Sequence, residues 1–137
     1  MFWQKWLFVL SLVIAVFGVL LALFSETPAF SIFHQQIDPA FFRAPDAEVM
    51  HFQQFIYGLL GATMAGWGVF MAFIAHYPFR KKEKWAWVCI AMGVLVWYVV
   101  DTSISLSFGV MFNAAFNTVV LILVALPLGF TWKDFGR

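Results

Sequence analysis

The chain carries very little charge. Only 11% of its 137 residues are charged, whereas 64% are hydrophobic and 20% are aromatic. A soluble domain of this size would have about a quarter of its residues charged, so these few polar side chains cannot form a wetted exterior around a buried core. The shortage of charge therefore excludes an ordinary soluble domain. The formal net charge of +1 also offers no basic surface for a nucleic-acid partner.

Cysteine is nearly absent as well. The single cysteine, Cys89, cannot form a disulfide within the chain, and we expect it to be a small packing residue in its apolar run. The three histidines show no metal-ligand spacing, and the chain has no phosphate-binding loop or nucleophile elbow. We therefore expect no metal and no cofactor, and leave open whether the chain is an enzyme.

Long apolar stretches dominate what is present. At about 20 residues per membrane span, the chain has room for an all-α integral membrane protein, with four transmembrane helices in one domain over residues 1–137. We expect spans over residues 6–24, 45–77, 85–105 and 109–130. The first span is longer than the core of a cleaved signal peptide and no cleavage-site pattern follows it, so we expect it to be retained.

Two loops between these spans differ in character. The loop over residues 25–44 is long, and Pro28 can begin a short helix in it that Pro39 would end. Apolar residues share one face of this insert, as in a helix that lies in the membrane interface. The loop over residues 78–84 is short and basic.

Basic residues predict the orientation. Seven of the eight lie on the side of both termini and the 78–84 loop: Lys5, Arg80, Lys81, Lys82, Lys84, Lys133 and Arg137. The positive-inside rule makes that side cytoplasmic, which predicts a multi-pass protein of the plasma (cell inner) membrane with both termini cytoplasmic. Five of the seven tryptophans lie at the same boundary, as an aromatic belt would: Trp3, Trp6, Trp85, Trp87 and Trp132.

Small residues follow one face of each of the first two spans. In the first span this seam is Ser11, Ala15, Gly18, Ala22 and Ser25. In the second span the seam begins with two polar residues and continues with small ones: His51, Gln54, Gly58, Gly61, Ala65, Gly68, Ala72 and Ala75. Because small residues let helix backbones approach closely in a membrane, both seams predict tight helix packing.

Polar residues gather near the expected outer boundary of three spans. We single out as a candidate ligand site His51, Gln54, Tyr57, Trp97, Asp101, Asn113 and Asn117. Polar side chains at that depth avoid lipid by facing the bundle interior, and an ionisable residue there suggests a functional site. In the alternative interpretation, Asp101 ends the third helix in water, and the two asparagines are hydrogen-bonding glue between helices.

Three functions stay open. The preferred hypothesis is an outer-leaflet pocket for a lipid-like, quinone-like or isoprenoid-like molecule, with Tyr57, Trp97 and Phe116 as walls and residues 28–42 as a lid. If chemistry occurs there, Asp101 and His51 are the only credible acid/base couple. The alternative is a non-catalytic accessory or homo-oligomeric subunit of a membrane complex. A small transporter comes third, because no polar line crosses the inner half.

In topology alone, the four spans are similar to those of small membrane proteins of the EXPERA kind, which enclose a lipid-like or sterol-like ligand. The paired acidic residues of that family have no match here, because Asp101 stands alone. The residues therefore assign the chain to no family.

Overall fold

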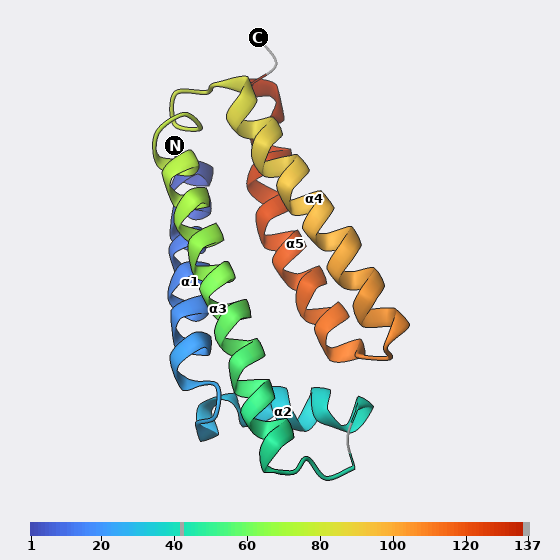
Figure 1. Ribbon diagram of the computed structural model, residues 1–137. Helices are drawn as coiled ribbons and strands as arrows, with labels where there is room; N and C mark the ends of the chain where they lie inside the picture. Colours follow the sequence, from blue (N-terminus) through green and yellow to red (C-terminus); the bar gives the residue numbers. More distant parts are fainter. Residues whose placement is uncertain (42, 136–137) are drawn as a thin grey trace.

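The computed structural model describes residues 1–41 and 43–135, and helices account for most of them (Figure 1). In chain order they are α1 (Phe2–Phe24), η1 (Pro28–Phe30), α2 (Ser31–Ile37), η2 (Asp38–Ala40), α3 (Ala47–His76), α4 (Lys84–Ser107), α5 (Met111–Thr131) and η3 (Trp132–Asp134). No strand occurs in the described part of the chain. Four helices are long and apolar enough to cross a membrane, namely α1, α3, α4 and the continuous segment Met111–Asp134. The prediction of an all-helical chain with four long apolar helices is confirmed.

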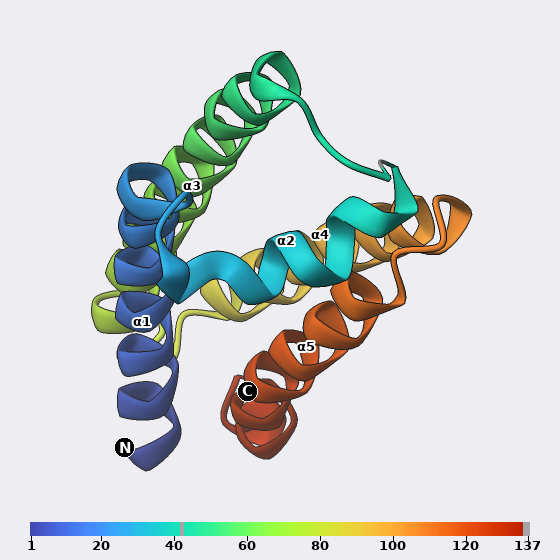
Figure 2. The same cartoon turned by 90° about the horizontal axis from the view of Figure 1, so that it is seen from below.

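The four long helices form two antiparallel pairs. One pair is α1 with α3, and the other is α4 with α5 (Figure 1). The first and last described residues lie at the same end of the molecule, which we call the terminal end. The short helix α2 crosses the opposite end, which we call the α2 end (Figure 2).

The pair α1–α3 is held together by the two predicted small-residue seams. A Cβ added to Gly61 would lie 2.5 Å from both the Ala22 nitrogen and the Gly18 oxygen, and one added to Gly68 would lie 2.5 Å from the Ala15 nitrogen. The two backbones are therefore in direct contact, which only residues without side chains permit. At the terminal end, the Gln4 side chain donates a hydrogen bond of 3.0 Å to the Ala75 carbonyl oxygen.

A tight turn joins the helices of the pair α4–α5. Gly109 has a φ of 73°, a left-handed conformation that glycine adopts without steric cost. Its N–H donates to the Leu106 oxygen at 3.1 Å, and the N–H of Val110 donates to the Ser105 oxygen at 2.8 Å. These two bonds form a Schellman motif, which ends α4 and reverses the chain at once.

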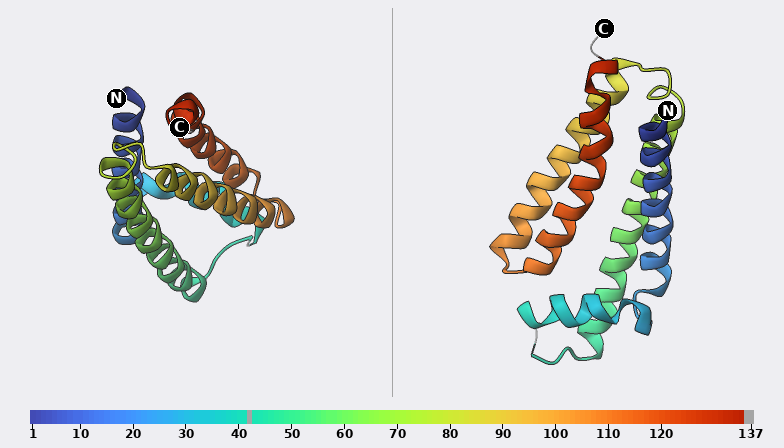
Figure 3. Two further views of the ribbon diagram at one scale, coloured as in Figure 1. Left: turned by 90° about the horizontal axis from the view of Figure 1, so that it is seen from above. Right: turned by 180° about the vertical axis from the view of Figure 1, so that it is seen from behind.

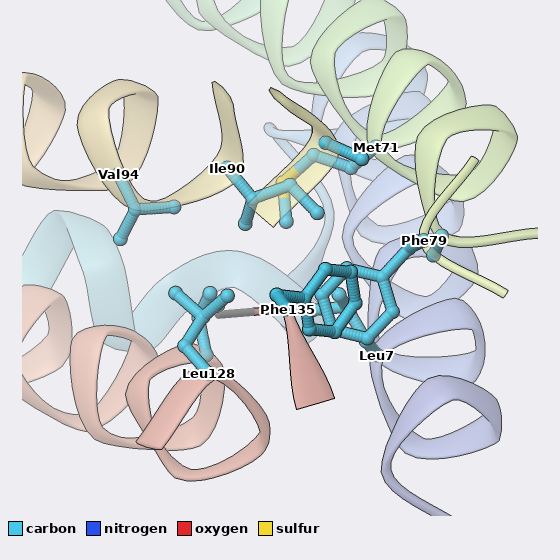
Figure 4. Packing of buried hydrophobic residues seen from close by; sticks show 10 residues of the cluster. Leu7, Met71, Phe79, Ile90, Val94, Leu128 and Phe135 are labelled. Carbon is cyan, nitrogen blue, oxygen red and sulfur yellow. The ribbon is translucent and has the colours of Figure 1, made fainter. Parts of the chain in front are cut away.

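The largest buried cluster lies toward the terminal end, where both helix pairs meet. Phe79 and Phe135, whose ring centroids are 4.6 Å apart, close this cluster (Figure 4). Leu7 comes from α1 and Met71 from α3, while α4 and α5 contribute Ile90, Val94, Val124 and Leu128. The basic loop therefore does more than carry charge, because Phe79 anchors it in the core.

The two pairs diverge toward the α2 end (Figure 3). Over their described residues, the backbone of α3 comes close to that of α4 at few positions and to that of α5 at none. Trp67 of α3 and Trp97 of α4 still meet, with ring centroids 5.5 Å apart. Toward the α2 end, the pairs are joined by α2 and by Phe17 of α1 and Phe116 of α5, whose ring centroids are 6.2 Å apart.

Phenylalanines fix one face of the η1–α2 segment to both pairs. Phe33 lies 6.0 Å from Phe17 of α1 and 5.7 Å from Phe112 of α5, measured between ring centroids. Phe30 and Phe116 complete this cluster. The apolar face that the sequence predicts for this insert thus packs between the two helix pairs.

Two expectations need adjustment. Cys89, expected to be a packing residue, is exposed on α4, because it lies off the face that meets α5. Arg137, counted with the basic residues of the terminal end, lies outside the described residues.

Candidate functional site

The first polar cluster joins α4 to α5 and is arranged symmetrically about the turn at Gly109. Ser105 and Asp101 lie four and eight residues before this glycine, and Asn113 and Asn117 lie four and eight residues after it. Each pair is one helical turn apart on one face. Because the turn folds α5 directly onto α4, the two faces meet.

A single oxygen of Asp101 accepts from both asparagine amides of this cluster. Its Oδ1 accepts from Asn113 Nδ2 at 2.8 Å and from Asn117 Nδ2 at 3.0 Å. The Ser105 hydroxyl lies 2.8 Å from the Asp101 main-chain oxygen and 3.3 Å from Oδ1. Asn113 also donates to the Ser105 hydroxyl at 2.8 Å. Asn117 is only 2% exposed and also reaches the Thr102 hydroxyl at 3.4 Å. The carboxylate is therefore stabilised by amide and hydroxyl donors.

No basic side chain takes part in this cluster. Among the described residues, the basic nitrogens that come close to a carboxylate are His34 Nδ1, at 3.5 Å from Asp38, and Lys82 Nζ, at 3.6 Å from Asp134. Asp101, in a chain with eight basic residues, thus has donors in place of a cation. The network ties α4 to α5, which is the role that the alternative interpretation gives the asparagines.

His51 and Gln54 lie apart from this network. Both are exposed, and together with Glu48, Phe52 and Phe55 they line a broad, open depression of about 520 Å³ on α3. The expected meeting with Asp101 does not occur among the described residues, because α3 leans away from α4 and α5 at this end. The candidate set is therefore divided between two places.

A second polar cluster, which the sequence analysis did not single out, joins α2 to α3. Gln53 donates to Asp38 Oδ1 at 2.8 Å, and His34 Nδ1 lies 3.5 Å from Asp38 Oδ2. The other ring nitrogen of His34, Nε2, lies 3.0 Å from the Ser25 carbonyl oxygen. Tyr57 packs edge-on against the His34 ring, at 5.3 Å between centroids.

A small cavity opens beside this second cluster. Its volume is about 170 Å³, and its lining comes from the turn after α1, from α2 and η2, from the segment before α3 and from the first turns of α3. The lining residues are Ser25, Glu26, His34, Asp38, Pro45, Met50, Gln53 and Gln54. We call it the α2–α3 cavity. Gln54 is the one member of the predicted site that lines it.

One signal for the second cluster was present in the sequence. His34 and Asp38 are four residues apart, and so lie on one face of a short helix. Gln53 carried no such signal, because its contact with Asp38 depends on how α2 crosses α3.

The other predicted residues take up separate positions. Trp97 packs against Trp67 and so lies between α3 and α4. Phe116, expected as a wall, packs against Phe17 and Phe33. Within residues 1–41 and 43–135, no three histidine, cysteine, aspartate or glutamate side chains gather as a metal site would require. Ligand binding by the predicted residues stays a prediction.

Comparisons with known proteins add no family to this description. No protein-family description, no curated protein and no solved structure matches the chain.

Proposed function

We propose that the chain is a multi-pass protein of the plasma membrane, with its terminal end in the cytoplasm. Support for this orientation comes from six described basic residues at that end: Lys5, Arg80, Lys81, Lys82, Lys84 and Lys133. The α2 end has one basic residue, Arg43, and four acidic residues, namely Glu26, Asp38, Asp46 and Glu48. This asymmetry agrees with the positive-inside rule, and it supports an orientation with α2 at the outer surface.

In that membrane the protein binds an amphiphile, lipid-like, quinone-like or isoprenoid-like, at its outer end. The headgroup occupies the α2–α3 cavity, and the tail lies along the apolar side chains that α3 leaves exposed. Met50, which lines the cavity, is 52% exposed and marks the boundary between the two parts. A ligand pocket has this form, with apolar surface and a few convergent polar groups.

The observation that carries this proposal is the polar lining of a cavity at the end of an apolar bundle. His34, Asp38 and Gln53 converge there from two helices and hold one another by short contacts. At about 170 Å³ the cavity is smaller than the roughly 300–1,000 Å³ of a site for a whole drug-sized ligand. It therefore suits a headgroup alone.

A cavity-filling substitution tests the proposal. The full chain is purified gently, and bound amphiphiles are identified by native mass spectrometry. We expect a retained amphiphile in the unchanged protein and its loss in Met50→Trp, whose larger side chain fills the cavity. Met92→Trp, at an exposed methionine of α4 outside both the lining and the exposed face of α3, should retain the ligand. Retention that is equal in both variants, or absent from the unchanged protein, contradicts the proposal.

A second function is favoured by the divergence of the helix pairs. The backbones of α3 and α5 stay apart over their described residues, and Leu59, Phe70 and Phe73 of α3 are exposed, so a helix of a partner or of a second copy can pack against α3. The protein would then be an accessory or homo-oligomeric subunit. If the protein is such a subunit, we expect the same mass spectra to show a stoichiometric protein partner or a multiple of the chain mass, and no bound amphiphile.

A further inference from the structure

We infer that the headgroup taken by the α2–α3 cavity carries a primary ammonium group. This inference rests on the amphiphile-binding function proposed above and names the chemical class of the ligand. Its basis is the charge of the lining and the balance of hydrogen-bond donors and acceptors within it.

The charge of the lining favours a cation. Two carboxylates, Glu26 and Asp38, line the cavity, and no lysine or arginine does. Glu26 forms no ion pair with the described residues. The nearest basic residue along the chain, Arg43, is exposed and lies outside the lining. A phosphate or carboxylate in the cavity would therefore meet like charge, whereas an ammonium group would meet opposite charge.

The geometry around His34 shows an excess of acceptors. The Ser25 carbonyl oxygen can only accept, so His34 Nε2, at 3.0 Å, carries the hydrogen of this bond. A neutral imidazole has one N–H, and its Nδ1 then presents a lone pair to Asp38 Oδ2 at 3.5 Å. Two acceptors thus face each other, and an N–H group from a ligand would satisfy both.

Protonation of His34 does not reverse this balance. With both ring nitrogens protonated, the lining still has two carboxylates, Glu26 and Asp38, against one cation. Gln53 donates to Asp38 Oδ1 at 2.8 Å, but its amide is neutral and does not compensate the negative charge of that carboxylate. The carboxylate of Glu26 stays available in either state. A primary ammonium offers three donors and one positive charge to this set.

The test measures which headgroup the delipidated full chain retains. Phosphatidylethanolamine, phosphatidylcholine and phosphatidylglycerol with identical acyl chains are added in a neutral detergent, and bound lipid is counted by native mass spectrometry. We expect ethanolamine lipid to be retained about fivefold or more over glycerol lipid, the effect of one partly exposed charge contact. Choline lipid, which has the charge without N–H donors, should fall between the two.

Variants assign this preference to the cavity. Glu26→Gln, on an exposed turn, and the double variant Glu26→Gln, Asp38→Asn should bring the ratio of ethanolamine to glycerol lipid toward one. Glu48→Gln removes a carboxylate from the same end of the molecule but outside this lining, so it should keep the preference. Loss of the preference in Glu48→Gln, or its persistence in the double variant, overturns the inference.

The remaining outcomes separate the inference from the function on which it rests. Equal or greater retention of glycerol lipid overturns the ammonium class and leaves amphiphile binding standing. Equal retention of choline and ethanolamine lipid overturns the role of N–H donors. Ethanolamine without a tail is added as a separate arm. If it stabilises the chain as much as the lipid does, the ammonium class holds and amphiphile binding fails.

Discussion

Asp101 illustrates how an acid can be kept in an apolar helix pair without a cation. Two amides, from the asparagines Asn113 and Asn117 of the facing helix, donate to its Oδ1. The arrangement therefore makes Asp101 the centre of the α4–α5 contact.

Two substitutions of Asp101 test whether the α4–α5 contact depends on its hydrogen-bond acceptor or on its charge. Asp101→Asn keeps an acceptor oxygen for Asn113 and Asn117, so we expect thermal stability within about 0.5 kcal/mol of the unchanged protein. Asp101→Leu leaves both amides without that acceptor and should destabilise by about 1–2 kcal/mol. Thermal unfolding in detergent, followed by circular dichroism, measures both. Equal stability of the leucine variant would show that the network does not hold the pair.

The two polar clusters differ in how far the sequence could predict them. Asp101, Asn113 and Asn117 meet because they are placed evenly around one tight turn, so spacing alone indicates a shared depth and face. His51 belongs to another helix pair, and its distance from Asp101 depends on the angle between pairs. No local pattern encodes that angle.

At the scale of elements, the size of the residues between two helices determines how closely they pack. Gly61 and Gly68 of the α3 seam lie directly against the α1 backbone at Gly18, Ala22 and Ala15, so the two helices approach closely at these positions. Between α3 and α4, by contrast, stand Trp67 and Trp97. The residues between α1 and α3 are small, whereas those between α3 and α4 are large. The small-residue pattern therefore predicts the tight α1–α3 pair, but it carries no information on the divergence of the two pairs.

Two glycines of α3 should respond oppositely to alanine. Gly61→Ala places a Cβ against the α1 backbone, and we expect a loss of about 1–3 kcal/mol from overpacking. Gly66→Ala meets nothing within 4 Å, so its stability should be unchanged or slightly raised, because alanine favours the helix. Thermal unfolding of both variants gives the comparison. A similar loss in both would contradict the close contact of α1 with α3.

The short helix α2 acts as a brace between the pairs. Phe33 contacts α1 and α5, while His34 and Asp38 contact α3 and the end of α1. One helix of seven residues thus reaches both pairs at the end where they diverge.

Removing the apolar half of the brace should loosen that end. In Phe33→Ala we expect a lower melting temperature and a broader distribution of distances between spin labels at Leu59 and Ile104, which are exposed on α3 and α4. The expected loss is about 2–3 kcal/mol, below that of a fully buried phenylalanine because Phe33 is only half-buried. Ile32→Ala, at an exposed neighbour, is the control. An unchanged distribution in Phe33→Ala would show that α2 does not brace the pairs.

For the whole molecule, the proposed orientation gives a prediction about accessibility. Cys89 is replaced by serine, and single cysteines are introduced at Gln36 of α2 or at Lys81 of the basic loop, both exposed positions. A thiol reagent that cannot cross membranes should label Gln36→Cys in intact cells, and Lys81→Cys only after permeabilisation. The reverse pattern would overturn the orientation.

The contact between α1 and α3 has a consequence for biosynthesis. Of the four candidate spans, α3 is the least apolar and α1 the most, and α1 is made first. The low hydropathy of α3 makes its transfer alone into hydrocarbon the least favourable of the four, and its glycine face packs closely against α1. We therefore expect α3 to enter the bilayer as a hairpin with α1 already there to receive it, so that the earliest helix serves as an assembly template for the one that follows.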